Sequence, residues 1–135
     1  MAEAVKPGGW LLIQEPDFHL APTTESAVWA RTWKGVIDWG QANGVDWLIG
    51  RTLPRMVAAP GLGHPEAKTD TQNIRGRDRG ALYFQLFLAE VRDRVIDSGQ
   101  LDAATIDAAS TLLNDPNYWT QGWMMTAVWL RKPFP

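Results

Sequence analysis

The sequence predicts an α/β fold. Apolar runs bounded by turns alternate with stretches of helical period, in the order strand, helix, helix, strand, helix, helix, strand. The length of 135 residues suits one domain, and 45% hydrophobic with 21% charged residues is the balance of an ordinary globular protein. No internal repeat or low-complexity tract interrupts this order.

Composition excludes several classes of function. Without cysteine there are no disulfides, thiolate metal sites or cysteine nucleophiles. A formal net charge of −2 provides no broad basic field, so neither nucleic acid nor membrane is an expected partner. The strongest run of one sign, Arg75, Arg77 and Arg79, is interpreted as a solvated loop. No apolar run reaches the roughly 20 residues that span a bilayer and no signal peptide is recognisable, so we expect a cytoplasmic protein.

The first predicted strand follows a turn. Lys6-Pro7-Gly8-Gly9 suits a type II turn, because proline presets φ and glycine tolerates a positive φ. Residues 10–13 are continuously apolar, which predicts a strand buried on both faces. The strand ends in a polar stretch, Gln14 to Asp17.

A helix over 25–41 is predicted next, because its apolar residues share one wide arc of the helical wheel and its charged residues share the other. Thr23 or Thr24 is the expected N-cap, and Asn43-Gly44 is the expected stop. A second helix over 47–59 contains Pro54, so it is kinked or begins late.

The remaining elements have weaker or mixed signals. Residues 67–74 form a strand so polar that it belongs at a sheet edge. The first half of a helix over 79–97 is apolar almost all round, which predicts burial on more than one side, against a substrate, another domain or another subunit. Asp102 caps a fourth helix that runs to about Leu113. Residues 123–130 are apolar on both faces, which predicts a central strand.

Candidate chemistry lies beyond the first strand. Ligands of open α/β sheets bind beyond the carboxyl ends of strands, where Glu15, Asp17 and His19 fall. His19 suits a general base that deprotonates a hydroxyl. The alternatives are a solvated loop with N-capping carboxylates, or a metal site, for which this spacing is a weak pattern. Of 8 tryptophans, some are expected to line a pocket or an interface, because each buried indole needs a partner for its N–H.

The ordered segments resemble those of class I S-adenosylmethionine-dependent methyltransferases. Residues 5–17, with Lys-Pro-Gly-Gly followed by an apolar strand and an acidic end, look like the segment that leads into and forms the fifth strand of that family. Residues 50–62 resemble the next helix, residues 67–74 the sixth strand, and residues 123–130 the seventh strand, which inserts antiparallel between the fifth and the sixth. The helices over about 79–114 are similar to the helical insertion of an actinobacterial-type subgroup.

The resemblance implies that residues 1–135 are one partial domain, the C-terminal half of a Rossmann-like methyltransferase sheet with an inserted helical pair. The family's cofactor-binding residues precede the Lys-Pro-Gly-Gly turn, so no S-adenosylmethionine binding and no catalysis are expected from this chain alone. The chain would supply the substrate side for a small-molecule acceptor. His19 is then the candidate catalytic base, and the candidate substrate-binding residues are Glu15, Asp17, Trp29, Trp33, Phe84, Phe87 and Trp119.

Absence of the family's fourth strand would leave strand 10–14 as an open sheet edge. We therefore expect a homodimer or pairing with a separately encoded N-terminal half. Two other interpretations remain open: a non-catalytic, tryptophan-rich module for small-molecule binding or dimerisation, and a truncated remnant without independent function.

Overall fold

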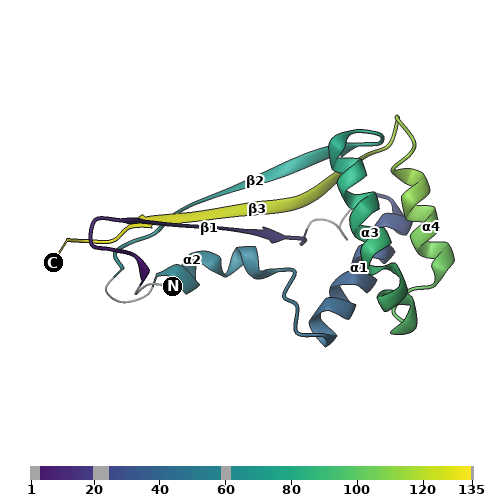
Figure 1. Cartoon of the computed structure of the whole chain (residues 1–135). Helices are drawn as coiled ribbons and strands as arrows, with labels where there is room; N and C mark the ends of the chain where they lie inside the picture. The colour runs from purple at the N-terminus through teal and green to yellow at the C-terminus, as the bar shows by residue number, and fades with distance from the viewer. Residues whose placement is uncertain (1–3, 20–24, 59–61, 135) are drawn as a thin grey trace.

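The computed structural model describes residues 4–19, 25–58 and 62–134. Within them the fold is mixed α/β. The strands are β1 (Trp10–Asp17), β2 (Glu66–Arg75) and β3 (Trp119–Arg131). The helices are α1 (Ala27–Ala42), α2 (Leu53–Val57), α3 (Arg79–Asp97) and α4 (Ala103–Leu112), with a 3₁₀ turn, η3 (Ile49–Arg51), before α2. The sheet and α2 form an extended arm, and α1, α3 and α4 gather at one end of it as a helical lobe (Figure 1).

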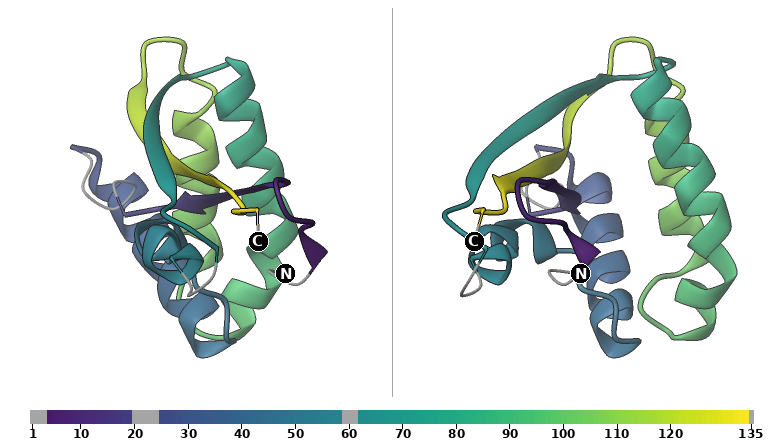
Figure 2. Two further views of the ribbon diagram at one scale, coloured as in Figure 1. Left: turned by 90° about the vertical axis from the view of Figure 1, so that its left-hand side faces the viewer. Right: turned by 60° about the vertical axis from the view of Figure 1, so that its left-hand side comes forward.

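The sheet has the order β1-β3-β2, with β3 antiparallel to both neighbours. This confirms that the last strand is central and that the polar strand lies at an edge. β1 pairs with β3 without interruption from Trp10↔Arg131 to Asp17↔Met124, whereas the β2–β3 register shifts between Thr71 and Asn73. Figure 2 shows the β2–β3 ribbon curving along its length until it reaches the helical lobe.

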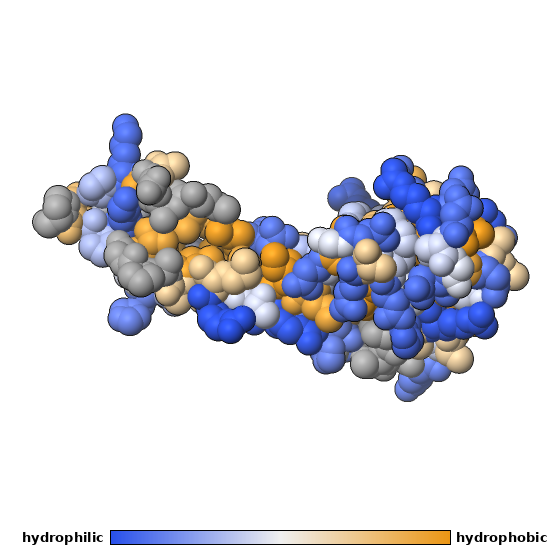
Figure 3. All heavy atoms as spheres, turned by 90° about the horizontal axis from the view of Figure 1, so that it is seen from below, coloured by the Kyte–Doolittle hydropathy of each residue, from blue (hydrophilic) through white to orange (hydrophobic). Residues whose placement is uncertain are grey.

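β1 is buried on one face only, so the expectation of burial on both faces is wrong. Trp10 and Leu12 are 63% and 67% exposed. Leu11 and Ile13, on the opposite face, pack against a cluster of residues from α2, β3 and the segment before β2: Leu53, Val57, Leu62, Val128 and Leu130. Figure 3 shows the arm from below, with hydrophobic residues gathered along it. The continuous apolar run therefore predicts a strand correctly here, but it does not show that both faces of the strand are covered.

The ends of the helices follow local signals. The N-cap of α1 is Ser26, whose Oγ accepts a hydrogen bond from the Trp29 amide at 3.3 Å, and the C-cap is Asn43. The prediction of Thr23 or Thr24 as the N-cap is therefore wrong; these two residues themselves lie outside the described part of the chain. Asp102 caps α4 as predicted, because its Oδ1 accepts from the Thr105 amide at 2.7 Å.

The second helix begins late, as Pro54 predicts. A 3₁₀ turn occupies Ile49–Arg51, and α2 then starts at Leu53 with proline in its first turn. Proline is tolerated there because the first amides of a helix have no partner within the helix.

The helical lobe has its own core, formed where α1, α3 and α4 meet. α3 contributes a buried side with Phe84, Leu88, Val91 and Val95. Its other side is exposed and includes Leu82, Tyr83 and Leu86, so within the described residues the apolar first half of α3 is covered on one side only.

The arginine run is more than a solvated loop. Arg75 Nε donates to the Pro116 carbonyl and Arg77 Nε to the Asn114 carbonyl, both at 2.7 Å. These bonds tie the turn after β2 to the turn before β3. No helix in the described part of the chain is long and apolar enough to cross a membrane.

Candidate functional site

The carboxyl end of β1 meets the helical lobe at a buried carboxylate. Asp17, only 1% exposed, accepts hydrogen bonds from Arg51 Nε at 2.8 Å and Arg51 Nη2 at 2.9 Å. Its Oδ1 also accepts from the backbone amide of His19 at 2.8 Å. A Cβ on Gly50 would lie 3.0 Å from the Cβ of Asp17, so the absence of a side chain lets η3 approach β1.

These contacts control the ionisation of Asp17. Burial raises the pKa of the carboxyl group, but the hydrogen bonds from Arg51 and from the His19 amide outweigh it, so the pKa is lowered overall. The same bond with Asp17 raises the pKa of Arg51. An ionised carboxylate held by three N–H groups is a poor proton acceptor, so Asp17 serves as an anchor between β1 and η3.

Glu15 and His19 complete the polar end of β1. Glu15 lies two residues before Asp17, hence on the same face of the strand, and is half-buried opposite Thr126. His19 is exposed, and its backbone amide donates a hydrogen bond to Asp17. Across residues 4–19, 25–58 and 62–134, no three His, Asp or Glu side chains are placed to hold a metal ion.

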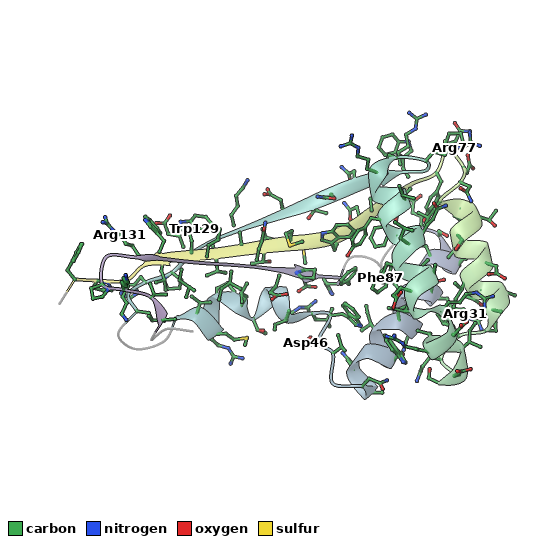
Figure 4. The ribbon with its side chains drawn as sticks, viewed as in Figure 1. Arg31, Asp46, Arg77, Phe87, Trp129 and Arg131 are labelled. Carbon is green, nitrogen blue, oxygen red and sulfur yellow. The ribbon has the colours of Figure 1, made fainter. Side chains whose placement is uncertain are left out.

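The predicted aromatic residues come together in the helical lobe. Phe18 stacks on Trp33 with ring centroids 4.8 Å apart, and Phe84 meets Trp29 and Trp33 edge-on at 5.2 and 5.0 Å. Figure 4 shows Phe87 between α3 and the end of β1, and its ring stacks on Trp33 at 5.5 Å. We call this group the aromatic cluster: Phe18, Trp29, Trp33, Trp47, Tyr83, Phe84, Phe87, Tyr118 and Trp123.

The centre of the aromatic cluster is closed to solvent. Trp29, Trp33 and Phe84 are each 0% exposed, so in this conformation they form a packed core and present no surface to a ligand. Trp119 is not part of the cluster: it is 61% exposed and lies under the Arg75 guanidinium, 5.8 Å from its ring centroid.

Several polar atoms in the aromatic cluster are buried without a hydrogen-bond partner among the described residues. They are the Nε1 atoms of Trp29, Trp33, Trp47 and Trp123 and the hydroxyl of Tyr118. Buried indole and phenol groups normally find a partner, and an unpaired one costs about 1–3 kcal/mol. The aromatic cluster is therefore mainly apolar but contains several hydrogen-bond donors without a partner among the described residues.

The described residues do not fit S-adenosylmethionine. The family's cofactor loop joins a strand to the N-terminus of a helix through glycines, and the β2–α3 connection with Gly76 is the nearest equivalent. The space beside Gly76 is filled by the Asp115 carbonyl, and the N-terminus of α3 is closed by the Asp78 side chain, which accepts from the Ala81 amide at 2.7 Å. The helix end that would face a ligand is thus already occupied.

Sequence reasoning missed the partners of the predicted residues. Arg51 is 34 positions away from Asp17, and no local pattern links them. The aromatic cluster also includes Phe18, just after β1, Trp47, in the α1–η3 connection, and Trp123, in β3. Only the high tryptophan content hinted at such a cluster.

Comparison with models of known protein families gives no match, and a search of curated protein sequences gives none either.

Proposed function

We propose that this chain supplies the acceptor-substrate side of a class I S-adenosylmethionine-dependent methyltransferase. The observation that carries the proposal is the sheet: a last strand inserted antiparallel between two strands that run parallel to each other, with Lys-Pro-Gly-Gly at the start of the first. This is the arrangement that the resemblance implies for the fifth, seventh and sixth strands.

Placement of the helical lobe supports the same proposal. The lobe stands at the carboxyl end of β1, where the ligands of open α/β sheets bind (Figure 1). It also contains the helical pair that corresponds to the expected insertion, α3 and α4.

The free edge of β1 supports a role for this chain as one side of a larger sheet. Among the described strands, β1 pairs with β3 alone. Pro16 has no amide hydrogen, so Pro16 and Met125 form a non-hydrogen-bonded pair, and by alternation the backbone groups of Leu12 and Gln14 point away from β3. These groups are available to a further strand, which in this proposal belongs to the cofactor-binding half.

In this proposal the chain would hold and orient the acceptor, and S-adenosylmethionine, bound by the other half, would supply the methyl group. His19, exposed beside the end of β1, would accept the proton of a hydroxyl acceptor. Asp17 would keep the His19 backbone in place through the hydrogen bond to its amide. The half-buried rings of Trp47 and Phe87, at the margin of the aromatic cluster, would form the wall against which the acceptor packs.

Calorimetry with S-adenosylmethionine tests this division of labour. We expect no binding by the 135-residue chain, and micromolar binding by an extended protein that includes the polypeptide proposed to pair with the free edge of β1. Micromolar binding by the chain alone would show that the cofactor site is here. Failure of the extended protein to bind would show that the methyltransferase proposal is wrong.

A second candidate function is a non-catalytic module that binds small aromatic molecules. The five donors in the aromatic cluster that lack a partner among the described residues favour it, because a ligand with carbonyl or phenol oxygens that opened the cluster would satisfy them. Tryptophan fluorescence separates the two candidates. Saturable quenching of this chain by an aromatic ketone, with no response to S-adenosylmethionine even in the extended protein, supports the module.

A further inference from the structure

The outer face of α3 carries an apolar stripe that stays largely exposed; Tyr83, at its margin, also contacts the ring of Trp123. Leu82, Tyr83 and Leu86 are 54%, 47% and 63% exposed. They are spaced three and four residues apart, so their side chains share one face of the helix. The buried residues Phe84, Leu88, Val91 and Val95 lie on the opposite face. In Figure 2, α3 stands at the outside of the helical lobe.

Charges at the two ends of the stripe have opposite signs. Arg79, in the first turn, is exposed on the same face as Leu82 and Leu86. Toward the other end lie Glu90 and Asp93, whose side chains are 74% and 90% exposed. Glu90 is 3.6 Å from Arg94 and Asp93 is 3.7 Å from Arg92, so both acids make only long ion pairs within the chain.

The helix dipole does not explain the charges of the stripe. Arg79, in the first turn, lies at the positive end of α3, whereas Asp93 lies before the last turn, where Arg94 already complements the negative end. Asp78, the N-cap, already satisfies the first amides. An antiparallel copy of the same stripe would instead set Arg79 opposite Asp93.

We propose that α3 docks against α3 of a second copy of this chain, antiparallel and about a twofold axis beside Leu86. Leu86 then contacts its own copy, as the isologous interface of a twofold dimer requires. Residues equally far from Leu86 meet across the axis, so Arg79, seven residues before it, lies opposite Asp93 of the second copy, seven after it. This contact occurs twice, and Leu82 and Tyr83 flank Leu86 on both sides.

The dimer leaves the other surfaces of the molecule free. α3 lies in the helical lobe, whereas the free edge of β1 lies in the arm (Figure 1). The proposal therefore does not depend on the methyltransferase assignment, and pairing at β1 is compatible with it.

Cysteine cross-linking tests the axis directly, because the chain has no cysteine of its own. Leu86→Cys places one thiol per chain on the proposed axis. Leu12→Cys is the matched control, since Leu12 is 67% exposed at the free edge of β1, where a dimer formed by strand pairing would have its axis. Under mild oxidation we expect most of the Leu86→Cys chains, and few of the Leu12→Cys chains, to migrate as a disulfide-linked dimer.

Charge reversal tests the register. Light scattering should give twice 15.1 kDa for the unmodified chain. Arg79→Glu places two acids opposite each other at both ends of the interface, so we expect the dissociation constant of the dimer to rise at least tenfold. Arg79→Glu combined with Asp93→Arg should restore the original affinity. The double variant also guards against a folding defect, because each single change is then present in a protein that dimerises.

Three outcomes would overturn the proposal. The first is a monomeric mass for the unmodified chain at every concentration of a series in 100-fold steps that reaches about millimolar. The second is efficient cross-linking through Leu12→Cys in place of Leu86→Cys, and the third is a double charge reversal that fails to restore the dimer.

Discussion

Two segments that are far apart in the chain meet at Asp17. Its carboxylate accepts hydrogen bonds from the Arg51 side chain in η3 and from the backbone amide of His19, just after β1. The pair is asymmetric, because the Asp17 side chain is 1% exposed and that of Arg51 is 42% exposed. Removing the arginine therefore leaves a buried charge without its partner, whereas removing the aspartate leaves a cation that water can solvate.

We expect Arg51→Met to destabilise the protein more than Asp17→Asn does, by roughly 3 against roughly 2 kcal/mol, because of this asymmetry. Urea denaturation followed by tryptophan fluorescence measures both values. Asp38→Asn is a suitable control, since Asp38 forms an exposed pair with Lys34 and its loss should cost below about 0.5 kcal/mol. Equal costs for the two main variants would mean that burial of Asp17 is not what makes the pair matter.

Acid should weaken the fold through the same carboxylate. The pKa of folded Asp17 is lowered, so its contribution is fully present above the unfolded value of about 3.9 and is lost as the pH falls through the folded value. Asp78 and Asp102, which cap α3 and α4, also have lowered pKa values and add to the effect. Denaturation between about pH 2 and pH 6 should show a smaller loss for Asp17→Asn than for the unmodified chain. Identical slopes would contradict this.

At the level of elements, α1 shows a conflict between helix propensity and packing. Gly40 lies inside α1, where alanine would normally add about 1 kcal/mol of stability. The indole of Trp47 lies directly against Gly40, however, and an added Cβ would overlap its Nε1. Glycine is therefore required by the approach of Trp47, not by the backbone.

Gly40→Ala should destabilise the protein by about 1–3 kcal/mol despite the gain in helix propensity. In a Trp47→Phe background, where the smaller ring leaves room, the same change should cost far less. Thermal unfolding of the four proteins gives the coupling energy directly. If the two changes are additive, Trp47 does not determine the requirement for glycine.

Elements were predictable where the signal is local. The polar edge strand, the Asp102 cap and the late start at Pro54 each depend on neighbouring residues, and each is confirmed. The burial of β1 was not predictable, because an apolar run of this kind looks the same whether one or both of its faces are covered. The Asp17–Arg51 pair and the assembly of the aromatic cluster depend on tertiary placement, for which the chain carries no local pattern.

At the scale of the whole molecule, the arm and the helical lobe have separate cores, and β3 runs through both. The arm is the thinner of the two, since α2 covers one face of its sheet. Its exposed apolar residues and the free edge of β1 make it the segment most prone to aggregation.

Neighbouring residues of β1 should respond oppositely to the same substitution. Leu12→Lys puts a charge on the exposed face, so we expect less aggregation on heating and a change of less than about 0.5 kcal/mol in unfolding free energy. Leu11→Lys places the charge against Val128 and Leu130, so it should cost about 2 kcal/mol or more. Turbidity during thermal unfolding measures the first effect and urea denaturation the second. Similar behaviour of the two variants would mean that the arm is covered on both faces.

The central position of β3 also affects the order in which the parts of the molecule fold during synthesis. Trp10 pairs with Arg131, so β1 leaves the ribosome roughly a hundred residues before its only described partner strand exists. In the helical lobe only α3 and α4 are neighbours in sequence, so they can pack on each other in the meantime, whereas neither β1 nor β2 can pair until β3 is complete. Such long-range pairing slows folding, and it leaves the apolar residues of β1 without cover during synthesis. The arm is thus the last part to fold, and a chaperone that shields β1 on the nascent chain would act on the step that limits the yield of native protein.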